Sequence, residues 1–247
     1  MKTKGNTILI TGGGSGIGEA LAHRLHDQGN KVLIAGRRLD ALKKAAAGRQ
    51  NIVPVELDID SPEKIEAFAR RIVADHPTLN VLINNAGIMR AEKLDQRRDL
   101  SDAEATITTN LLGPIRLINA LVDHLASQPD ATIINNSSGL AFVPLIHTPT
   151  YSATKAAIHS YTVSLREVLK GRIEVIELAP PAVQTTLTPG QESREGYQPL
   201  TEFADEVVSL LNTQPTPAEV LVKRVGFLRF AEQENRYAEA LKAVNSH

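Results

Sequence analysis

The sequence contains no cysteine and no tryptophan, and aromatic residues of all kinds make up only 4% of it. Without cysteine the chain can form no disulfide, no thiolate metal site and no cysteine nucleophile, which fits a reducing compartment. Basic and acidic side chains nearly balance, 27 against 28, so no net field attracts nucleic acid or an anionic membrane. We therefore expect neither nucleic acid nor a membrane as a partner.

Long apolar runs and targeting signals are missing as well. No stretch approaches the ~20 apolar residues that a membrane-spanning helix requires. Residues 1–7 are short and polar and do not resemble a signal peptide. The histidines are scattered along the chain, so we predict no metal site. These features predict a soluble, cytoplasmic protein.

The 247 residues do contain a regular alternation of β-rich runs and longer helical patterns. The runs predicted as strands are Thr7–Ile10, Lys31–Ala35, Ile52–Val55, Asn80–Ile83, Ala131–Asn135 and Arg172–Leu178. The predicted helices include Gly18–Gln28, Ser61–Asp75, Thr106–Ala126 and Tyr151–Lys170. Such alternation predicts an α/β fold of one domain, 1–247, in which a doubly wound parallel sheet of Rossmann type carries helices on both faces.

A glycine-rich segment joins the first predicted strand to the first predicted helix. Residues 11–18 read Thr-Gly-Gly-Gly-Ser-Gly-Ile-Gly. Glycines allow bare backbone N–H groups to approach a diphosphate at the positive end of a helix. The gap from Gly12 to Gly16 is one residue longer than in the common dinucleotide fingerprint. A glycine-rich surface turn is the alternative, but the strand before and the amphipathic helix after favour nucleotide binding.

The end of the second predicted strand bears on the choice of cofactor. An NAD-binding chain would carry an acidic residue there for the ribose 2′-hydroxyl. This chain instead reads Gly36-Arg37-Arg38. Because guanidinium groups pair well with phosphate, the sequence favours NADP over NAD. The alternative is that both arginines are solvated charges at the start of a helix.

Tyr151 and Lys155 lie four residues apart in a helical pattern, so their side chains share one face. A phenol titrates near ~10 and is a poor acid or base at neutral pH unless a cation stabilises its anion. Lys155 would supply that cation. A Tyr-x-x-x-Lys pair alone is also common on solvated helix faces, and its interpretation depends on the rest of the chain.

Further motifs follow in a fixed order. Asp58-Ile59 follows the third predicted strand, Asn84-Asn85-Ala86-Gly87 ends the fourth, Asn110 lies in the long helix, and Asn136-Ser137-Ser138 follows the fifth. Together with the glycine pattern and the Tyr151–Lys155 pair, this set resembles the short-chain dehydrogenase/reductase family in its single-domain form. The resemblance covers about residues 5–186.

The resemblance implies a role for each matching residue. The catalytic residues would be Asn110, Ser138, Tyr151 and Lys155. Tyr151 would exchange a proton with the substrate oxygen, Ser138 would hydrogen-bond the same oxygen, and Lys155 would lower the pKa of Tyr151 and bind the nicotinamide ribose. Asn110 would hold a water of the proton relay. The cofactor-binding residues would be Gly12, Ser15, Gly16, Ile17, Gly18, Arg37, Asp58, Ile59, Asn85, Ala86, Gly87, Tyr151, Lys155, Pro180, Val183 and Thr185.

The function that these residues predict is an NADP-dependent oxidoreductase, which interconverts a small carbonyl compound and an alcohol by hydride transfer. Two alternatives remain open. One is a catalytically silent nucleotide-binding regulatory protein on the same fold, and the other is a dehydratase or epimerase of the same scaffold. The presence of Ser138, Tyr151 and Lys155 disfavours the silent protein.

The chain departs from the family pattern at Pro181, which stands where the family usually has glycine. In this feature the chain resembles a bacterial branch of oxidoreductases. Residues 184–200 contain prolines, glycines and scattered charge, and predict a mobile loop that closes over the substrate. The apolar residues of 140–146 predict part of a substrate pocket, with ordinary packing as the alternative. The charge-rich segment 92–102 predicts a solvated loop.

The helical pattern of Thr106–Ala126 carries more apolar positions than one sheet face needs. In the family this helix and the helix of Tyr151 form a subunit interface. The resemblance therefore implies a homodimer or homotetramer.

Overall fold

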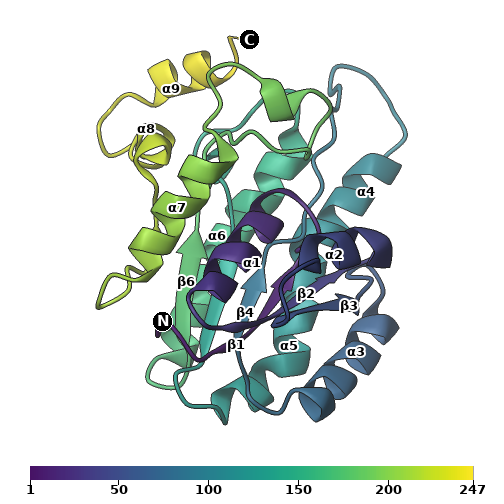
Figure 1. Ribbon diagram of the computed structural model, residues 1–247. Coiled ribbons are helices and arrows are strands. Elements are labelled where there is room, and N and C mark those ends of the chain that lie inside the picture. Colours follow the sequence, from purple (N-terminus) through teal and green to yellow (C-terminus); the bar gives the residue numbers. More distant parts are fainter. Residues whose placement is uncertain (247) are drawn as a thin grey trace.

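The computed structural model describes residues 1–246, in which seven parallel strands form one sheet between two layers of helices (Figure 1). The strands are β1 Thr7–Thr11, β2 Lys31–Gly36, β3 Ile52–Glu56, β4 Leu79–Asn84, β5 Thr132–Asn136, β6 Glu174–Leu178 and β7 Glu219–Val220. The helices are α1 Gly16–Asp27, α2 Leu39–Ala46, α3 Pro62–Asp75, α4 Ser101–Ile107, α5 Gly113–Ala126, α6 Pro149–Leu169, α7 Leu200–Leu211, α8 Gly226–Arg229 and α9 Tyr237–Val244. The predicted fold class is confirmed.

The strand order is β3-β2-β1-β4-β5-β6-β7. The chain builds outward from β1 to β3, then crosses back and builds from β4 to β7 in the other direction. The order therefore reverses between β1 and β4, and the loops at the carboxyl ends of these two strands diverge. In open α/β sheets a crevice forms at such a point, and ligands bind there.

Side-chain alternation along the strands divides the core into two layers. Ile8 and Ile10 of β1 pack on one face with α1 and α7, whereas Leu9 packs on the other face with α3, α5 and the end of α6. Successive side chains of a strand point to opposite faces, so a strand buried on both sides needs a continuous apolar run. β1 and β2 have this run, and their interior residues are completely buried.

The predicted helix Thr106–Ala126 is not one regular helix. Helical structure begins five residues earlier, at Ser101, and Thr108–Leu112 form a π-helical turn before α5. The N–H of Gly113 bonds the carbonyl of Thr108, five residues back. Pro114 explains the widened turn, because it has no N–H to donate to the carbonyl of Asn110.

Part of the segment 92–102 also differs from the predicted solvated loop. The side chain of Glu92 is buried, forms an ion pair with Arg98, and accepts hydrogen bonds from the backbone N–H and the hydroxyl of Thr150. Thr150 lies in the first turn of α6, so this loop is tied to the helix that carries Tyr151. No helix within residues 1–246 is long and apolar enough to cross a membrane.

Candidate active site

The glycine loop between β1 and α1 lies directly against the loop that follows β4. Gly12 has φ +68°, and a Cβ there would meet the Cα of Ala86 at 2.9 Å. A Cβ on Gly18 would lie 2.4 Å from the carbonyl oxygen of Gly12. Ser15 occupies the N-cap of α1 but makes no side-chain hydrogen bond to the first turn. The N–H groups of that turn are therefore free of a side-chain cap, as an anion-binding helix start requires.

Two adjoining cavities open at this edge of the sheet, with volumes of about 420 and 400 Å³. We name the first the tyrosine cavity, because Ser138, Tyr151 and Lys155 line it. The second is the arginine cavity, lined by Gly36 and Arg37 among others. Both cavities share the glycine loop and the loop after β4, so they form one groove across the switch point between β1 and β4.

The groove brings together most of the residues that the motifs single out. Those in the wall of the tyrosine cavity are Gly12, Ser15, Gly16, Ile17, Asn85, Ala86, Gly87, Ser138, Tyr151, Lys155, Pro180, Val183 and Thr185. Arg37 and Ile59 line the arginine cavity. Three predicted residues, Gly18, Asp58 and Asn110, line neither cavity. Asp58 instead pairs with Lys64 at 3.0 Å, and this hydrogen bond holds the pKa of Asp58 below its usual range.

Tyr151 and Lys155 project from the first turns of α6 and are almost entirely buried. The Lys155 ammonium donates a 2.7 Å hydrogen bond to the carbonyl of Asn136, at the end of β5. It also lies 5.5 Å from the centre of the Tyr151 ring. Ser138, two residues after Asn136, hydrogen-bonds Tyr151. A hydroxyl, a phenol and an ammonium from β5 and α6 thus meet in one wall of the tyrosine cavity.

The pKa values of this pair differ from the expectation that Lys155 lowers the pKa of Tyr151. Burial raises the pKa of Tyr151 to about 12, and the hydrogen bond from Ser138 only partly opposes the rise. Burial also lowers the pKa of Lys155 to about 8. Both shifts have one cause, since a dry environment disfavours the phenolate and the ammonium alike. In the free protein the phenol therefore stays protonated at neutral pH.

The Asn110 side chain hydrogen-bonds the backbone of the loop after β4 and lines neither cavity. Its Oδ1 accepts from the N–H of Ile88, and its Nδ2 donates to the carbonyl of the same residue, both at 2.8 Å. A Cβ on Gly87 would lie 3.3 Å from the Asn110 Oδ1. The π-helical turn at Thr108–Leu112 thus points the buried Asn110 amide toward the loop after β4, which lines both cavities.

Arg37 and Arg38 follow β2 at the outer end of the groove. Arg37 is exposed and lies 3.5 Å from the Asp60 carboxylate, whereas Arg38, at the N-cap of α2, lines both cavities. Among the described residues that line the arginine cavity, none is acidic. Arg38 is therefore the arginine that lines both cavities, whereas the predicted cofactor-binding residues include only Arg37 of the two.

Several residues that the motifs did not indicate line the tyrosine cavity, among them Met89, Arg90, Leu187 and Gln191. The Gln191 amide donates to the carbonyl of Val183 at 2.8 Å and to the hydroxyl of Thr185 at 3.1 Å. These residues belong to loops whose course a motif does not determine.

The apolar residues of 140–146, in contrast, do not line this cavity. Val143 is fully buried against Ala231 and Ala240, and Phe142 packs against the core beneath α7. Ordinary packing accounts for Phe142 and Val143, whereas Ile146 at the end of the segment is exposed.

A doubly wound sheet with a glycine-rich first turn and a Ser-Tyr-Lys cluster at its switch point defines a dinucleotide-dependent class of oxidoreductase. Residues 6–196 match the family model for short chain dehydrogenases, and the chain belongs to the short-chain dehydrogenase/reductase family. It is 40% identical, over 200 residues, to the uncharacterized oxidoreductase DltE of Bacillus subtilis strain 168, with 79% of each chain covered.

Solved structures agree on the fold. A short chain dehydrogenase from Burkholderia cenocepacia J2315 in complex with NADP is 26% identical, with a TM-score of 0.82 over 98% of this chain and 99% of that one. A short chain dehydrogenase/reductase from Burkholderia phymatum in complex with NAD has a TM-score of 0.82 over 96% of each chain at 20% identity. Both dinucleotides thus occur in proteins of this fold.

The close approach at Gly18 predicts a sharp stability effect. Gly18→Ala would force its methyl group to within 2.4 Å of the Gly12 carbonyl oxygen, which is backbone and cannot rotate away. Overpacking of this kind costs about 1–3 kcal/mol, and each kcal/mol lowers the Tm of a chain this long by roughly 2–4 °C. We therefore expect calorimetry to find a clearly lower Tm for Gly18→Ala.

Gly14→Ala is the matched control in the same loop. Its Cβ would come closest to the Leu42 side chain, at 3.2 Å, which can move, and would meet backbone atoms only at the ordinary contact distances of 3.5 and 3.6 Å. A wild-type Tm for Gly18→Ala, or an equal loss for Gly14→Ala, would contradict the packing described here.

Proposed function

We propose that this chain is an NADP-dependent oxidoreductase that interconverts a small carbonyl compound and its alcohol, with Tyr151 as the general acid and base. The observation that carries the proposal is the convergence of Ser138, Tyr151 and Lys155 on a cavity that continues to the uncapped start of α1. Each group then meets a requirement of the chemistry.

The glycine loop fits a dinucleotide, because its backbone approaches closely where side chains would collide and its N–H groups lack a side-chain cap. Gly12, Ser15, Gly16 and Ile17 would hold the diphosphate. Asn85, Ala86, Gly87, Pro180, Val183 and Thr185 would border the nicotinamide half, and Asp58 and Ile59 the adenine. Once bound, the cofactor supplies or accepts the hydride.

In this proposal the residues of the tyrosine cavity handle the proton and the developing charge. The Tyr151 hydroxyl gives its proton to the substrate oxygen in reduction, and Ser138 donates a hydrogen bond to the same oxygen. Lys155 carries positive charge beside Tyr151 and stabilises the phenolate that proton transfer leaves. Asn110 holds the loop after β4 and anchors a water of the relay through which a proton from solvent returns, by way of Lys155, to the Tyr151 phenolate.

Two further assignments belong to the proposal. Residues 184–200 act as the substrate lid, supported by the two backbone hydrogen bonds of Gln198, with Ala182 and Gln184, that tie the ends of this loop together. The chain assembles as a homodimer or homotetramer, supported by apolar side chains left exposed near α5 and on α6, among them Leu112, Val163 and Val168. The cytoplasm is the proposed compartment.

A panel screen tests the function. The purified protein is mixed with NADPH and a set of aldehydes and ketones, and in the other direction with NADP and secondary alcohols, while the absorbance of the reduced nicotinamide is followed. We expect at least one substrate pair to be interconverted. Tight NADPH binding without turnover of any pair would favour the silent regulatory protein. Conversion of a substrate with no net change in NADPH would favour a dehydratase or epimerase.

The pKa of Lys155 predicts the pH dependence. Since burial lowers this pKa to about 8, the ammonium is present below that pH and lost above it. The kcat/KM for NADPH, which reports groups of the free enzyme, should be level up to about pH 8 and then fall roughly tenfold for each further pH unit. Tyr151, with a pKa of about 12, stays protonated over this range and adds no second limb.

Lys155→Arg provides the control for the pH profile. A guanidinium stays charged at every pH of the assay, so whatever activity this variant retains should not fall near pH 8. A wild-type profile that stays level to about pH 10 would exclude Lys155 as the titrating group.

A further inference from the structure

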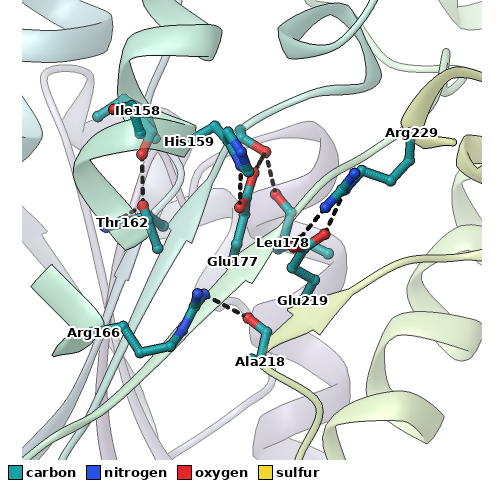
Figure 2. A network of polar contacts seen from close by, with 12 residues as sticks. Ile158, His159, Thr162, Arg166, Glu177, Leu178, Ala218, Glu219 and Arg229 are labelled. Carbon is teal, nitrogen blue, oxygen red and sulfur yellow. Dashed lines mark hydrogen bonds and ion pairs between the residues drawn. The ribbon is translucent and has the colours of Figure 1, made fainter. Parts of the chain in front are cut away.

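Glu177 on β6 carries a carboxylate that is completely buried within a network of polar contacts (Figure 2). It bonds Ser137, which lines the tyrosine cavity. Burying a charge is costly unless hydrogen bonds or an opposite charge compensate for it. The partners of this carboxylate therefore indicate what it does.

The two carboxylate oxygens bond two different elements. Oε1 accepts a 2.5 Å hydrogen bond from the hydroxyl of Ser137. Oε2 lies 2.8 Å from Nδ1 of His159 (Figure 2). Ser137 directly precedes Ser138 at the end of β5. His159 lies on α6 one turn after Lys155 and two turns after Tyr151. Glu177 thus joins the chain that carries the serine to the helix that carries the tyrosine and the lysine.

Two other hydrogen bonds join β5 directly to α6, one from Lys155 to the carbonyl of Asn136 at 2.7 Å and one from the amide of Asn135 to the hydroxyl of Thr162 at 3.0 Å. The Lys155 and Glu177 links are the ones nearest Ser138, and they lie on either side of the peptide between Asn136 and Ser137. Together they fix the position of the Ser138 hydroxyl relative to the Tyr151 hydroxyl. Reaction rates are sensitive to such positions, because a displacement of about 1 Å can cost ~10²-fold.

The neighbouring carboxylate, Glu219, has no such connection. Glu219 is the partner of Glu177 in the register of β6 and β7. Its two oxygens bond the Arg229 guanidinium at 2.6 and 2.9 Å (Figure 2). This ion pair joins β7 to α8, and neither oxygen of Glu219 bonds Ser137 or His159. Arg229 also lies 4.8 Å from the centre of the Phe142 ring. Glu177 and Glu219 are therefore neighbouring carboxylates with different partners.

We propose that Glu177 is a positioning residue of the active site, holding Ser137 and His159 so that Ser138 faces Tyr151 and Lys155. It contacts neither substrate nor cofactor in this role. The proposal deepens the proposed function and rests on it.

The test compares three variants on the substrate found in the panel screen. Glu177→Leu should lower kcat of the folded protein roughly 10- to 100-fold while the KM for NADPH stays unchanged. Glu177→Gln should retain most of the wild-type kcat, because its amide oxygen can accept from Ser137 and its amide nitrogen can donate to the other tautomer of His159. Glu219→Leu, which removes the adjacent carboxylate, should lower the Tm and leave kcat unchanged.

The contrary outcomes are equally definite. A kcat within about twofold of wild type in Glu177→Leu overturns the proposal, and so does an equal fall of kcat in Glu219→Leu. Should Glu177→Leu fail to fold, Ser137→Ala breaks the same bond and leaves Glu177 paired with His159. It should also lower kcat with the KM for NADPH unchanged, and a wild-type kcat in this variant overturns the proposal.

Hydrogen exchange gives a readout that needs no substrate. In Glu177→Leu, peptides covering 136–143 and 149–159 should exchange faster, whereas β1 should not change. A uniform rise over all strands would mean that Glu177 contributes only to global stability, and the positioning role would be withdrawn. If the wild-type protein converts no carbonyl compound, the proposed function fails, but this exchange comparison still decides whether Glu177 positions the wall of the cavity.

Discussion

Tyr151→Phe is expected to lower kcat by about 10²–10⁴-fold while the affinity for NADPH stays close to that of the wild type. The substitution removes one hydroxyl and keeps the ring, which is only 8% exposed and packs in the wall of the tyrosine cavity. The glycine loop, which we propose binds the cofactor, is untouched. The fall in kcat therefore reports the loss of the transferable proton and not a change in the shape of the site.

Tyr161→Phe is the control for this variant. Tyr161 lies on the same helix ten residues later, packs against the core beneath the sheet and is absent from both cavities. It should keep the kcat of the wild type. If Tyr151→Phe retains more than about a tenth of the wild-type kcat, Tyr151 is not the acid, because general acid catalysis is typically worth ~10²–10⁴-fold.

The direction of the pKa shifts bears on the direction of the reaction. Because burial raises the pKa of Tyr151 to about 12, the free protein holds this phenol protonated at neutral pH. A protonated phenol beside an ammonium that is present below about pH 8 is prepared to donate a proton to a carbonyl oxygen. Oxidation of an alcohol needs the phenolate instead. We therefore expect the rate of reduction to be level up to about pH 8, and the rate of oxidation to rise with pH over that range because the phenolate fraction of Tyr151 increases.

The sequence predicted the first six strands to within a few residues, because each contains a run rich in β-forming apolar residues between polar or glycine-containing turns. Most of these runs are buried, whereas the edge strand β3 is largely half-buried. It missed the elements that are too short to show a period, such as β7 with two residues and α2 with eight. It also missed the π-helical turn before α5, whose cause, Pro114, could have been recognised as a break in the hydrogen-bond ladder.

For the candidate site, the residues at strand ends could be predicted and the residues supplied by packing could not. The predicted residues at strand ends include Gly12 after β1, Asn85 after β4 and Ser138 after β5. Because the carboxyl ends of parallel strands meet at one edge of the sheet, the topology alone predicts that these residues lie close together. Gln191 lines the tyrosine cavity only because of the way its loop folds, which no motif predicts. Glu177 lies in a strand, where nothing in the sequence reveals that its carboxylate bonds both Ser137 and His159.

The choice of cofactor predicts the second large effect. Arg37 and Arg38 follow β2, and none of the described residues lining the arginine cavity is acidic. A 2′-phosphate there would gain charge-assisted hydrogen bonds worth roughly 1.5–3 kcal/mol, or about ten- to a hundredfold in affinity, whereas a 2′-hydroxyl would gain little. Fluorescence titration of the wild type should therefore find NADPH bound at least about tenfold more tightly than NADH.

Gly36→Asp combined with Arg37→Ile should reverse this order, because it adds an acceptor for the ribose and removes one cation. Arg38 lines both cavities, so Arg37→Ile alone should weaken NADPH only in part, and Arg38→Ile alone should weaken it at least as much. Lys43→Ile, at an exposed position of α2, is the control for a general loss of positive charge and should leave the ratio unchanged, since Lys43 lines neither cavity. Equal affinities of the wild type for the two cofactors would mean that both arginines merely face solvent, and the NADP assignment would be withdrawn.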